Sequence, residues 1–263
     1  MKYSKIGLAL GGGGARGFAH VGVLKYLEEN GIHPDIVSGT SAGSIVAAAY
    51  AMGHTAEEIY DFFSQVDPRK LELITKRNDG GLVSSSFLQK ALKEFFGDAD
   101  LEDSRIPVKV VATDLDLGRT RVFESGSAAL TVLASCTLPI VFAPVKIDDH
   151  YFVDGGLYKN FPVTTIRDYC DILIGVNIGS KIADQYDMNI KNIGLRCWNL
   201  ISKENVIYDN YACDILIDSP KFSKFSIYDH KQAPKLYKLG YKLAKESEKL
   251  NKLIELKKKQ AKQ

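Results

Sequence analysis

The sequence lacks any uninterrupted apolar run close to the roughly 20 residues that a membrane-spanning helix requires. Its first apolar run, residues 6–10, stops at four glycines and is too short for the hydrophobic region of a signal peptide. Cysteine is also scarce: the four cysteines form neither a CxxC pair nor a cluster with histidines at zinc-ligand spacing. We therefore expect a cytoplasmic protein with reduced cysteines and no metal centre.

An excess of charge of one sign is also missing. The 34 basic side chains nearly balance the 32 acidic ones, and a net charge of +2 is too small to favour nucleic acid as a partner. The chain has 263 residues, 45% of them hydrophobic and 25% charged, which is enough to bury a large core in one domain. We expect a globular α/β protein, and nothing in the sequence indicates its oligomeric state.

The hydrophobic pattern alternates between strand and helix periods. Two successive units share the order strand, glycine-rich turn and helix: residues 5–10, 11–17 and 18–30, then 35–38, 39–43 and 44–52. Further helices are predicted at 87–96 and 128–136, and further strands at 108–115, 120–123, 142–147, 151–153, 172–178 and 215–217. This order predicts a three-layer α/β/α fold with a mostly parallel central sheet.

Two segments depart from this plan. Residues 64–86, which include Pro68, are predicted to form a long surface excursion that borders or covers a functional site. Residues 235–262 form one lysine-rich helical pattern with an apolar stripe, and the lysines at 257–259 head a basic tail. Two interpretations of this helix stay open: a solvated C-terminal helix, or peripheral contact with anionic headgroups at a membrane surface.

A glycine-rich motif follows the first predicted strand. Its residues match GxGxxG: Gly12, Gly13, Gly14, Ala15, Arg16 and Gly17. The pattern is typical of dinucleotide sites, but such a site needs an acidic residue at the end of the second strand, whereas Asp35 stands at its start. The turn is either purely structural or an anion site, because unobstructed backbone N–H groups at a helix start attract negative charge, including an oxyanion.

A second motif lies between the next predicted strand and helix. Gly39, Thr40, Ser41, Ala42 and Gly43 match GxSxG, in the strand, turn and helix context of a nucleophile elbow. The glycines on either side remove Cβ clashes from a sharp turn that holds a serine hydroxyl above the sheet. Ser41 is therefore the candidate nucleophile.

The serine needs a base, because a free hydroxyl is a weak nucleophile. The five histidines lie in no triad-like context, and only His150 is kept as a reserve. Asp154 follows a predicted strand and precedes Gly155 and Gly156, which places a carboxylate at a strand end. An ordinary Asp-Gly turn is the alternative for this segment, but a donor loop, an elbow and a carboxylate together are the parts required for acyl transfer.

These three motifs, in this order, resemble those of the patatin-like phospholipase family: a GxGxxG oxyanion motif, a GxSxG elbow and a DG[AG] motif that carries the base. The resemblance extends to residues 133–139 before a strand and to Asn160 and Pro162 after the aspartate, and it covers roughly residues 5–180. It implies a catalytic core over 5–180, with residues 181–263 as an extension packed on the same domain and ending in a basic helix.

The resemblance implies a lipid acyl hydrolase of the phospholipase A or lysophospholipase type, acting on a phospholipid or lysophospholipid without metal or organic cofactor. Ser41 is then the nucleophile and Asp154 the group that activates it. The N–H groups of Gly12, Gly13 and Gly14 form the oxyanion hole, and Arg16 is the family's basic residue in that loop. Two alternatives remain: an acyltransferase that uses the same serine, and a non-catalytic regulatory protein with this fold.

Overall fold

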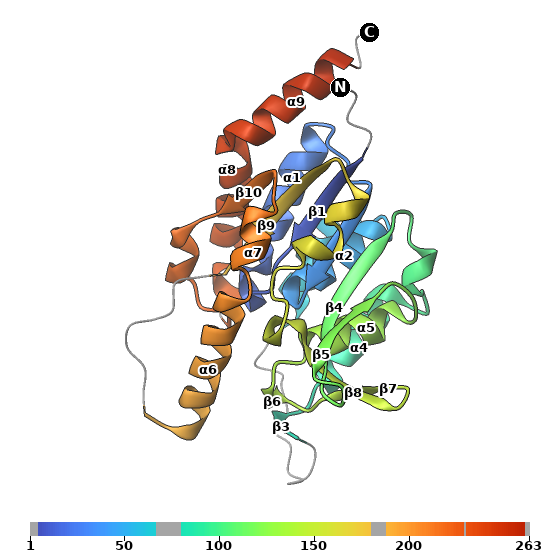
Figure 1. The fold of residues 1–263 in the computed structure, drawn as a ribbon, viewed down its shortest axis with the longest axis vertical. Helices are drawn as coiled ribbons and strands as arrows, with labels where there is room; N and C mark the ends of the chain where they lie inside the picture. The colour runs from blue at the N-terminus through green and yellow to red at the C-terminus, as the bar shows by residue number, and fades with distance from the viewer. Residues whose placement is uncertain (1–4, 67–79, 180–187, 229, 261–263) are drawn as a thin grey trace.

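The computed structural model describes residues 5–66, 80–179, 188–228 and 230–260, and its centre is an eight-stranded sheet (Figure 1). Seven strands follow the spatial order β10, β9, β1, β2, β4, β8, β7, and β5 pairs with β4. Their bounds are β1 Ile6–Leu10, β2 Ile36–Thr40, β4 Val108–Asp114, β5 Arg119–Phe123, β7 Val145–Ile147, β8 His150–Asp154, β9 Ile172–Asn177 and β10 Ile215–Asp218. β3 (Gly81–Val83) and β6 (Ile140–Phe142) form a separate two-stranded sheet.

The strand directions place several loops at one edge of the sheet. β10, β9, β1, β2 and β4 run parallel, so their carboxyl ends share this edge, whereas β5 and β8 run antiparallel to β4. Thr40 at the end of β2 pairs with Val111 of β4, and Asp154 at the end of β8 pairs with the next residue, Ala112. β5 pairs with β4 across from both strands, so β2 and β8 lie along the same side of β4, and the end of β2 meets the end of β8 there.

Helices flank the sheet, as the alternating pattern predicts. Their bounds are α1 Phe18–Glu29, α2 Ala42–Ala51, α3 Ala56–Gln65, α4 Ser86–Phe96, α5 Ala128–Cys136, α6 Ile190–Glu204, α7 Ile207–Tyr211, α8 Ala233–Glu246 and α9 Glu248–Gln260. The main core joins one face of the sheet to helices that include α1, α2, α5 and α8. The other face has a smaller core in which Phe161, Val163 and Ile166 of a short irregular segment pack with Val206, so this layer is thin.

Two predicted elements are each divided in the structure. Residues 142–147 were expected as one strand, but β6 and β7 are separate and belong to different sheets. Pro144 lies between them and has no N–H to donate to a strand ladder. Residues 235–262 were expected as one helix, but Ser247 adopts an extended conformation between α8 and α9, and its hydroxyl accepts the Leu250 N–H at 3.3 Å.

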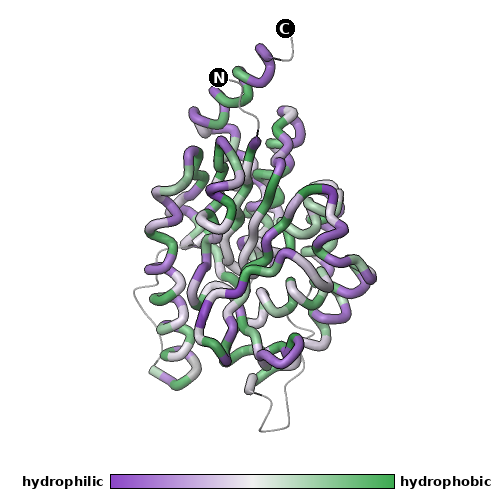
Figure 2. The backbone as a smooth tube through the Cα atoms, turned by 45° about the vertical axis from the view of Figure 1, so that its right-hand side comes forward, coloured by the Kyte–Doolittle hydropathy of each residue, from purple (hydrophilic) through white to green (hydrophobic). Residues whose placement is uncertain are grey.

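Hydrophobic and hydrophilic residues are distributed unevenly over the molecule. Figure 2 shows hydrophobic residues along the central strands, while α9 projects from one end and carries many hydrophilic residues. None of the described helices combines the length and apolar character needed to cross a membrane.

Candidate active site

Ser41 occupies a sharp turn between β2 and α2, as the GxSxG motif predicts. Its φ of 53° and ψ of −127° lie where non-glycine residues are rare and strained. A Cβ on Gly39 would overlap the carbonyl oxygen of Gly43, and one on Gly43 would overlap that of Leu10. Both flanking positions therefore require glycine, and the strained serine is half-buried at the start of α2.

Buried hydroxyl groups hold the backbone of the turn. The Ser41 N–H donates to Oγ of Ser135 at 2.8 Å, and that hydroxyl donates to the Val111 carbonyl at 2.6 Å. The Ser41 carbonyl accepts both the hydroxyl and the N–H of Ser44, at 2.6 and 2.8 Å. These bonds fix the conformation of Ser41 without engaging its own hydroxyl.

The hydroxyl of Ser41 instead faces the carboxylate of Asp154, close enough to lower the pKa of that carboxylate as a donor. Asp154 ends β8 and is 4% exposed, and its Oδ1 accepts the Gly156 N–H at 2.8 Å. Burial raises the pKa of Asp154 to about 6, although the hydrogen bonds from Ser41 and Gly156 favour the ionised form. The carboxylate is thus a stronger base than a solvated aspartate.

The glycine loop lies directly against this pair. A Cβ on Gly12 would come within 3.2 Å of the Ser41 Cβ. The Gly12 N–H donates to the Asn160 carbonyl at 2.9 Å, which differs from the expectation that three consecutive glycines donate to an oxyanion. Among the described residues, no acceptor engages the N–H groups of Gly13 and Gly14, so these two donors are the candidates for binding a ligand.

The side chains of Arg16 and His20 hold the glycine loop in place through hydrogen bonds. The Arg16 Nε donates to the Phe225 carbonyl at 2.9 Å, and burial lowers its pKa to about 10. His20 is fully buried, with Nε2 2.7 Å from the Gly11 carbonyl. Burial lowers the pKa of His20 to about 4, so the neutral ring donates from Nε2. Gly17 packs between this loop and α3, beside Phe63.

Other residues hold the Asp154 loop and were not singled out from the sequence. Asn205, which caps the end of α6, donates from Nδ2 to the carbonyls of Gly156 and Leu157 at 2.9 and 3.3 Å. Its Oδ1 accepts the Asn160 N–H at 2.9 Å. A Cβ on Gly156 would lie 2.8 Å from Cζ2 of Trp198, so this indole covers the loop. The sequence signal for Asn205 is weak, because its partners lie 45 or more residues away.

Gly155 is packed against the sheet beside the aspartate. A Cβ at this position would overlap the Val111 carbonyl, so the DGG segment can follow β8 closely only with glycine. Both glycines after Asp154 are buried.

His150, the reserve base, does not share the site. It begins β8, four residues or about 13 Å of strand from Asp154. Its Nδ1 lies 3.2 Å from Oδ1 of Asp114, and the same oxygen accepts the N–H groups of Asp116 and Leu117. Asp114, Asp116 and His150 come close enough to group as metal-ligand types, but these hydrogen bonds account for the cluster as part of the hairpin turns.

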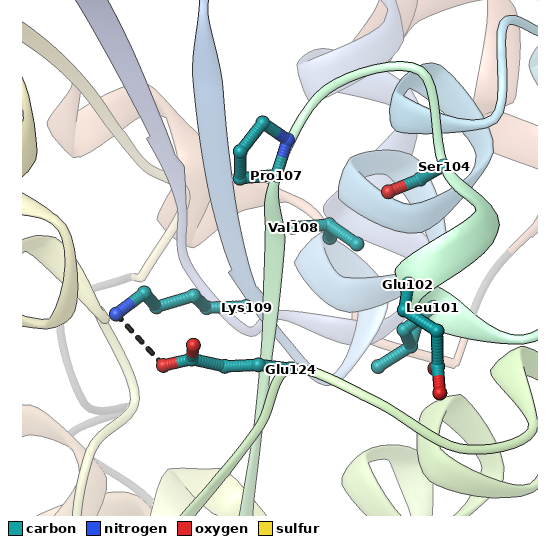
Figure 3. Close-up of a pocket in the computed structure, with 7 residues that line it drawn as sticks. All are labelled: Leu101, Glu102, Ser104, Pro107, Val108, Lys109 and Glu124. Atoms are coloured by element: carbon teal, nitrogen blue, oxygen red, sulfur yellow. Dashed lines mark ion pairs between the residues drawn. The ribbon is translucent and has the colours of Figure 1, made fainter.

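A pocket of about 250 Å³ lies elsewhere, at the start of β4 (Figure 3). It is lined by Pro107, Val108 and Lys109, whose Nζ pairs with Glu124 at 2.9 Å. Val108 pairs with Val37, near the amino end of β2, so this pocket is at the opposite edge of the sheet from Ser41.

The predicted excursion over residues 64–86 is partly outside the described residues, since 67–79 are not described. Its described end forms β3, which pairs with β6 in parallel. Ile140 of β6 in turn lies against Gly194 of α6, and α6 covers the Asp154 loop. Whether the excursion covers the site stays a prediction.

Known proteins resemble this chain over the part that contains Ser41 and Asp154. A family model described as patatin-like phospholipase matches residues 8–166. The chain is 32% identical over 206 residues to patatin-like phospholipase domain-containing protein 6 of Mus musculus, covering 75% of this chain and 15% of that protein. It is 32% identical over 210 residues to lysophospholipase NTE1 of Kluyveromyces lactis, covering 75% and 14%. An uncharacterized NTE family protein of Mycobacterium tuberculosis is 30% identical over 218 residues, covering 81% and 60%.

The chain therefore spans only part of the length of these relatives. Among solved structures, VipD from Legionella pneumophila has a TM-score of 0.53 at 16% identity, covering 89% of this chain and 67% of that one. At this identity the likeness is one of fold.

Proposed function

Because the chain belongs to the patatin-like phospholipase family, we propose that it hydrolyses acyl ester bonds of phospholipids or lysophospholipids through a Ser41 and Asp154 dyad. The observation that carries the proposal is the position of the Ser41 hydroxyl against a buried carboxylate, beside a loop in which two N–H groups have no acceptor among the described residues. A nucleophile, a base and oxyanion donors then meet at one point.

In the first half of the proposed cycle, Oγ of Ser41 attacks the ester carbonyl carbon as Asp154 accepts the hydroxyl proton. The carbonyl oxygen becomes an oxyanion that accepts hydrogen bonds from the N–H groups of Gly13 and Gly14. Collapse of this intermediate breaks the bond to the alcohol, which leaves with the proton from Asp154. The products of this half are the free alcohol and an acyl ester on Ser41.

In the second half, Asp154 accepts a proton from water as the water oxygen attacks the acyl carbonyl. The same two N–H groups hold the second oxyanion, and the bond to Oγ then breaks. Ser41 takes back its proton from Asp154, and a fatty acid leaves. One oxyanion donor typically contributes about 10²–10³ in rate, so the loop matters as much as the nucleophile.

Burial of Asp154 supports the base role. An aspartate with an ordinary pKa near 3.9 is a poor base for a hydroxyl. A pKa of about 6 brings the carboxylate closer to the operating pH, where general-base catalysis is most effective. The dry surroundings also strengthen its hydrogen bond to Ser41.

The two alternatives are less well supported. A transferase of the malonyl transacylase kind pairs its serine with a histidine, whereas no histidine in the described part of the chain bonds to Ser41, and the carboxylate that faces it is that of Asp154. A non-catalytic protein with this fold has no need to retain the strained serine, the buried carboxylate and the open donors together.

The test is release of fatty acid by the purified chain from a panel of phospholipids, lysophospholipids and a soluble short-chain ester. We expect hydrolysis that is lost in Ser41→Ala and kept in Ser64→Ala, a control serine exposed on α3. Absence of hydrolysis across the panel would contradict the proposal. Product analysis with added lysophospholipid or thiol would detect transfer, since an acyltransferase would form a new ester or thioester.

A further inference from the structure

α6 connects the Asp154 loop to an exposed surface. Its inner side carries Trp198 over Gly156, and Asn205 at its end bonds to the same loop. Figure 1 shows α6 standing at the lower edge of the molecule, with β3 and β6 beside its lower end. The helix is therefore a wall of the candidate site on one side and part of the molecular surface on the other.

The outer side of this wall is unusually apolar. Large exposed apolar side chains gather on α6, α7 and the residues just before α6: Met188, Ile190, Leu200, Ile201, Ile207, Tyr208 and Tyr211. We call these seven residues the α6–α7 surface. Ile190 is 95% exposed, Tyr208 85% and Tyr211 86%, so nothing in the described chain covers them.

Ile190 and Ile201 belong to a stripe along α6. They are 11 residues apart, close to three helical turns, and the exposed Cys197 lies between them on the same side. Several large exposed apolar side chains on neighbouring helices are typical of a binding surface.

Charged groups add little to this surface. Among the described side chains from 188 to 211, only Lys203 and Glu204 are exposed charges. Asp209 is fully buried and bonds to Nζ of Lys159 at 2.9 Å, so it does not face outward. Tyrosines beside aliphatic side chains suit a membrane interface, where a ring can be half in lipid and half in water.

We propose that the α6–α7 surface docks this protein on a lipid bilayer, with the aliphatic side chains below the headgroups and the tyrosines at their level. The proposal rests on the proposed function and identifies its partner surface. Docking through α6 would bring the Asp154 loop to the bilayer, because the same helix contacts both. Substrate could then enter without crossing water.

The basic helix α9 is not placed for this role. Asn251 of α9 accepts the hydroxyl of Tyr26, near the end of α1, and Lys249 donates to the Asp214 carbonyl just before β10. Both partners lie at the amino edge of the parallel strands, and Figures 1 and 2 show α9 at the far end of the molecule from α6. A bilayer held by the lysines at 257–259 would face away from Ser41.

The first experiment uses vesicle sedimentation in a Ser41→Ala background, so that no lipid is hydrolysed. The test variant combines Ile190→Gln with Tyr208→Gln. The matched control combines Leu256→Gln on α9 with Tyr169→Gln, which are 44% and 55% exposed at the opposite edge. We expect the test variant to bind phosphatidylcholine vesicles about tenfold more weakly, since it removes one aliphatic and one aromatic anchor. The control loses the same two types of side chain outside the proposed surface, so its binding should be unchanged.

A second measurement needs no substitution on the proposed surface. Trp198 is the single tryptophan of the chain and lies on α6. Phosphatidylcholine vesicles with brominated acyl chains should quench its emission, and unlabelled vesicles should not.

Three results would overturn the proposal. These are equal loss of vesicle binding in both variants, loss in the control alone, or no quenching of Trp198 by brominated lipid. Conversion of a dimer to a monomer by the test variant, with vesicle binding unchanged, would assign the surface to a second copy instead. Hydrolysis of a soluble short-chain ester tests the proposed function separately, and both surface variants should retain it on the Ser41 background.

Discussion

Replacement of Asp154 by asparagine should stabilise the folded protein while it removes activity. Burial raises the pKa of Asp154 from its ordinary value of 3.8 to about 6, against hydrogen bonds from Ser41 and Gly156. This corresponds to about 3 kcal/mol of unfavourable free energy for the ionised carboxylate, since a tenfold change in ionisation equals about 1.4 kcal/mol. Asparagine has a similar shape and no charge, so it avoids this cost while the Gly156 N–H can keep an acceptor.

The effect should depend on pH in a defined direction. Because the folded-state pKa is higher than the unfolded one, the folded chain binds more protons between pH 3.8 and about 6. The contribution of Asp154 to stability therefore falls as the pH rises through this window, and the full cost is present above it. Asp154→Asn should be about 1–3 kcal/mol more stable than the parent at pH 8 and equal to it near pH 3.8.

Thermal unfolding at several pH values measures this difference, which amounts to about 5 °C in Tm at pH 8 for a chain of this size. Asp209→Asn is the matched control. Asp209 is equally buried but pairs with Nζ of Lys159 and accepts the hydroxyl of Thr164, so its replacement should destabilise the fold. The reasoning would be refuted if Asp154→Asn were no more stable than the parent at pH 8. If the proposed dyad acts, kcat/KM of the unmodified chain should fall about tenfold per pH unit below about pH 6.

Three further predictions concern the dyad, the elbow and metals. Ser41→Ala and Asp154→Asn should each lower ester hydrolysis by at least about 10³-fold, and the double variant should be scarcely worse, because the pair acts as one device. Only Ser41→Ala should also abolish labelling by a fluorophosphonate; full activity in Asp154→Asn would remove the base assignment. Gly43→Ala should cost about 3 kcal/mol or more in denaturant unfolding, because its Cβ would overlap the Leu10 carbonyl, whereas Gly11→Ala, with its nearest contact at 3.4 Å, should be tolerated. Hydrolysis should persist in EDTA, and loss of activity restored by a divalent ion would contradict the metal-free mechanism.

The sequence was sufficient for the parts of the site that are local. Gly39 could be inferred without a fold, because the atoms that its Cβ would overlap belong to Gly43 and Ser44 of the same turn. Gly43 matches the same motif, but the carbonyl that its Cβ would overlap belongs to Leu10 of β1, which only the fold brings near. The capping box of Thr55 and Glu58 at the start of α3 is equally local, and this TxxE signal could have located that helix.

Long-range contacts decided what the sequence could not give. The Gly12 N–H looked available within its motif, but the carbonyl of Asn160 accepts it across the sheet edge. His20, one of the four histidines set aside in the sequence, is fully buried and donates to the Gly11 carbonyl. Neither the hydrophobic periodicity nor the motif spacing of a single sequence identifies which distant carbonyl accepts a given hydrogen bond. Ser135 illustrates the same point, since it holds the Ser41 N–H from 94 residues away.

The residues beyond the family match have a specific part in the site. The family model ends at residue 166, yet the glycine loop is held by the carbonyls of Phe225 and Ile227, which accept from Arg16 and the Ala15 N–H. Asn205 holds the Asp154 loop in the same way. Oxyanion donors contribute to catalysis only when they are fixed before the reaction begins. Substitutions at these clamping positions should therefore change rate more than substrate affinity, although none of the residues touches the reacting atoms.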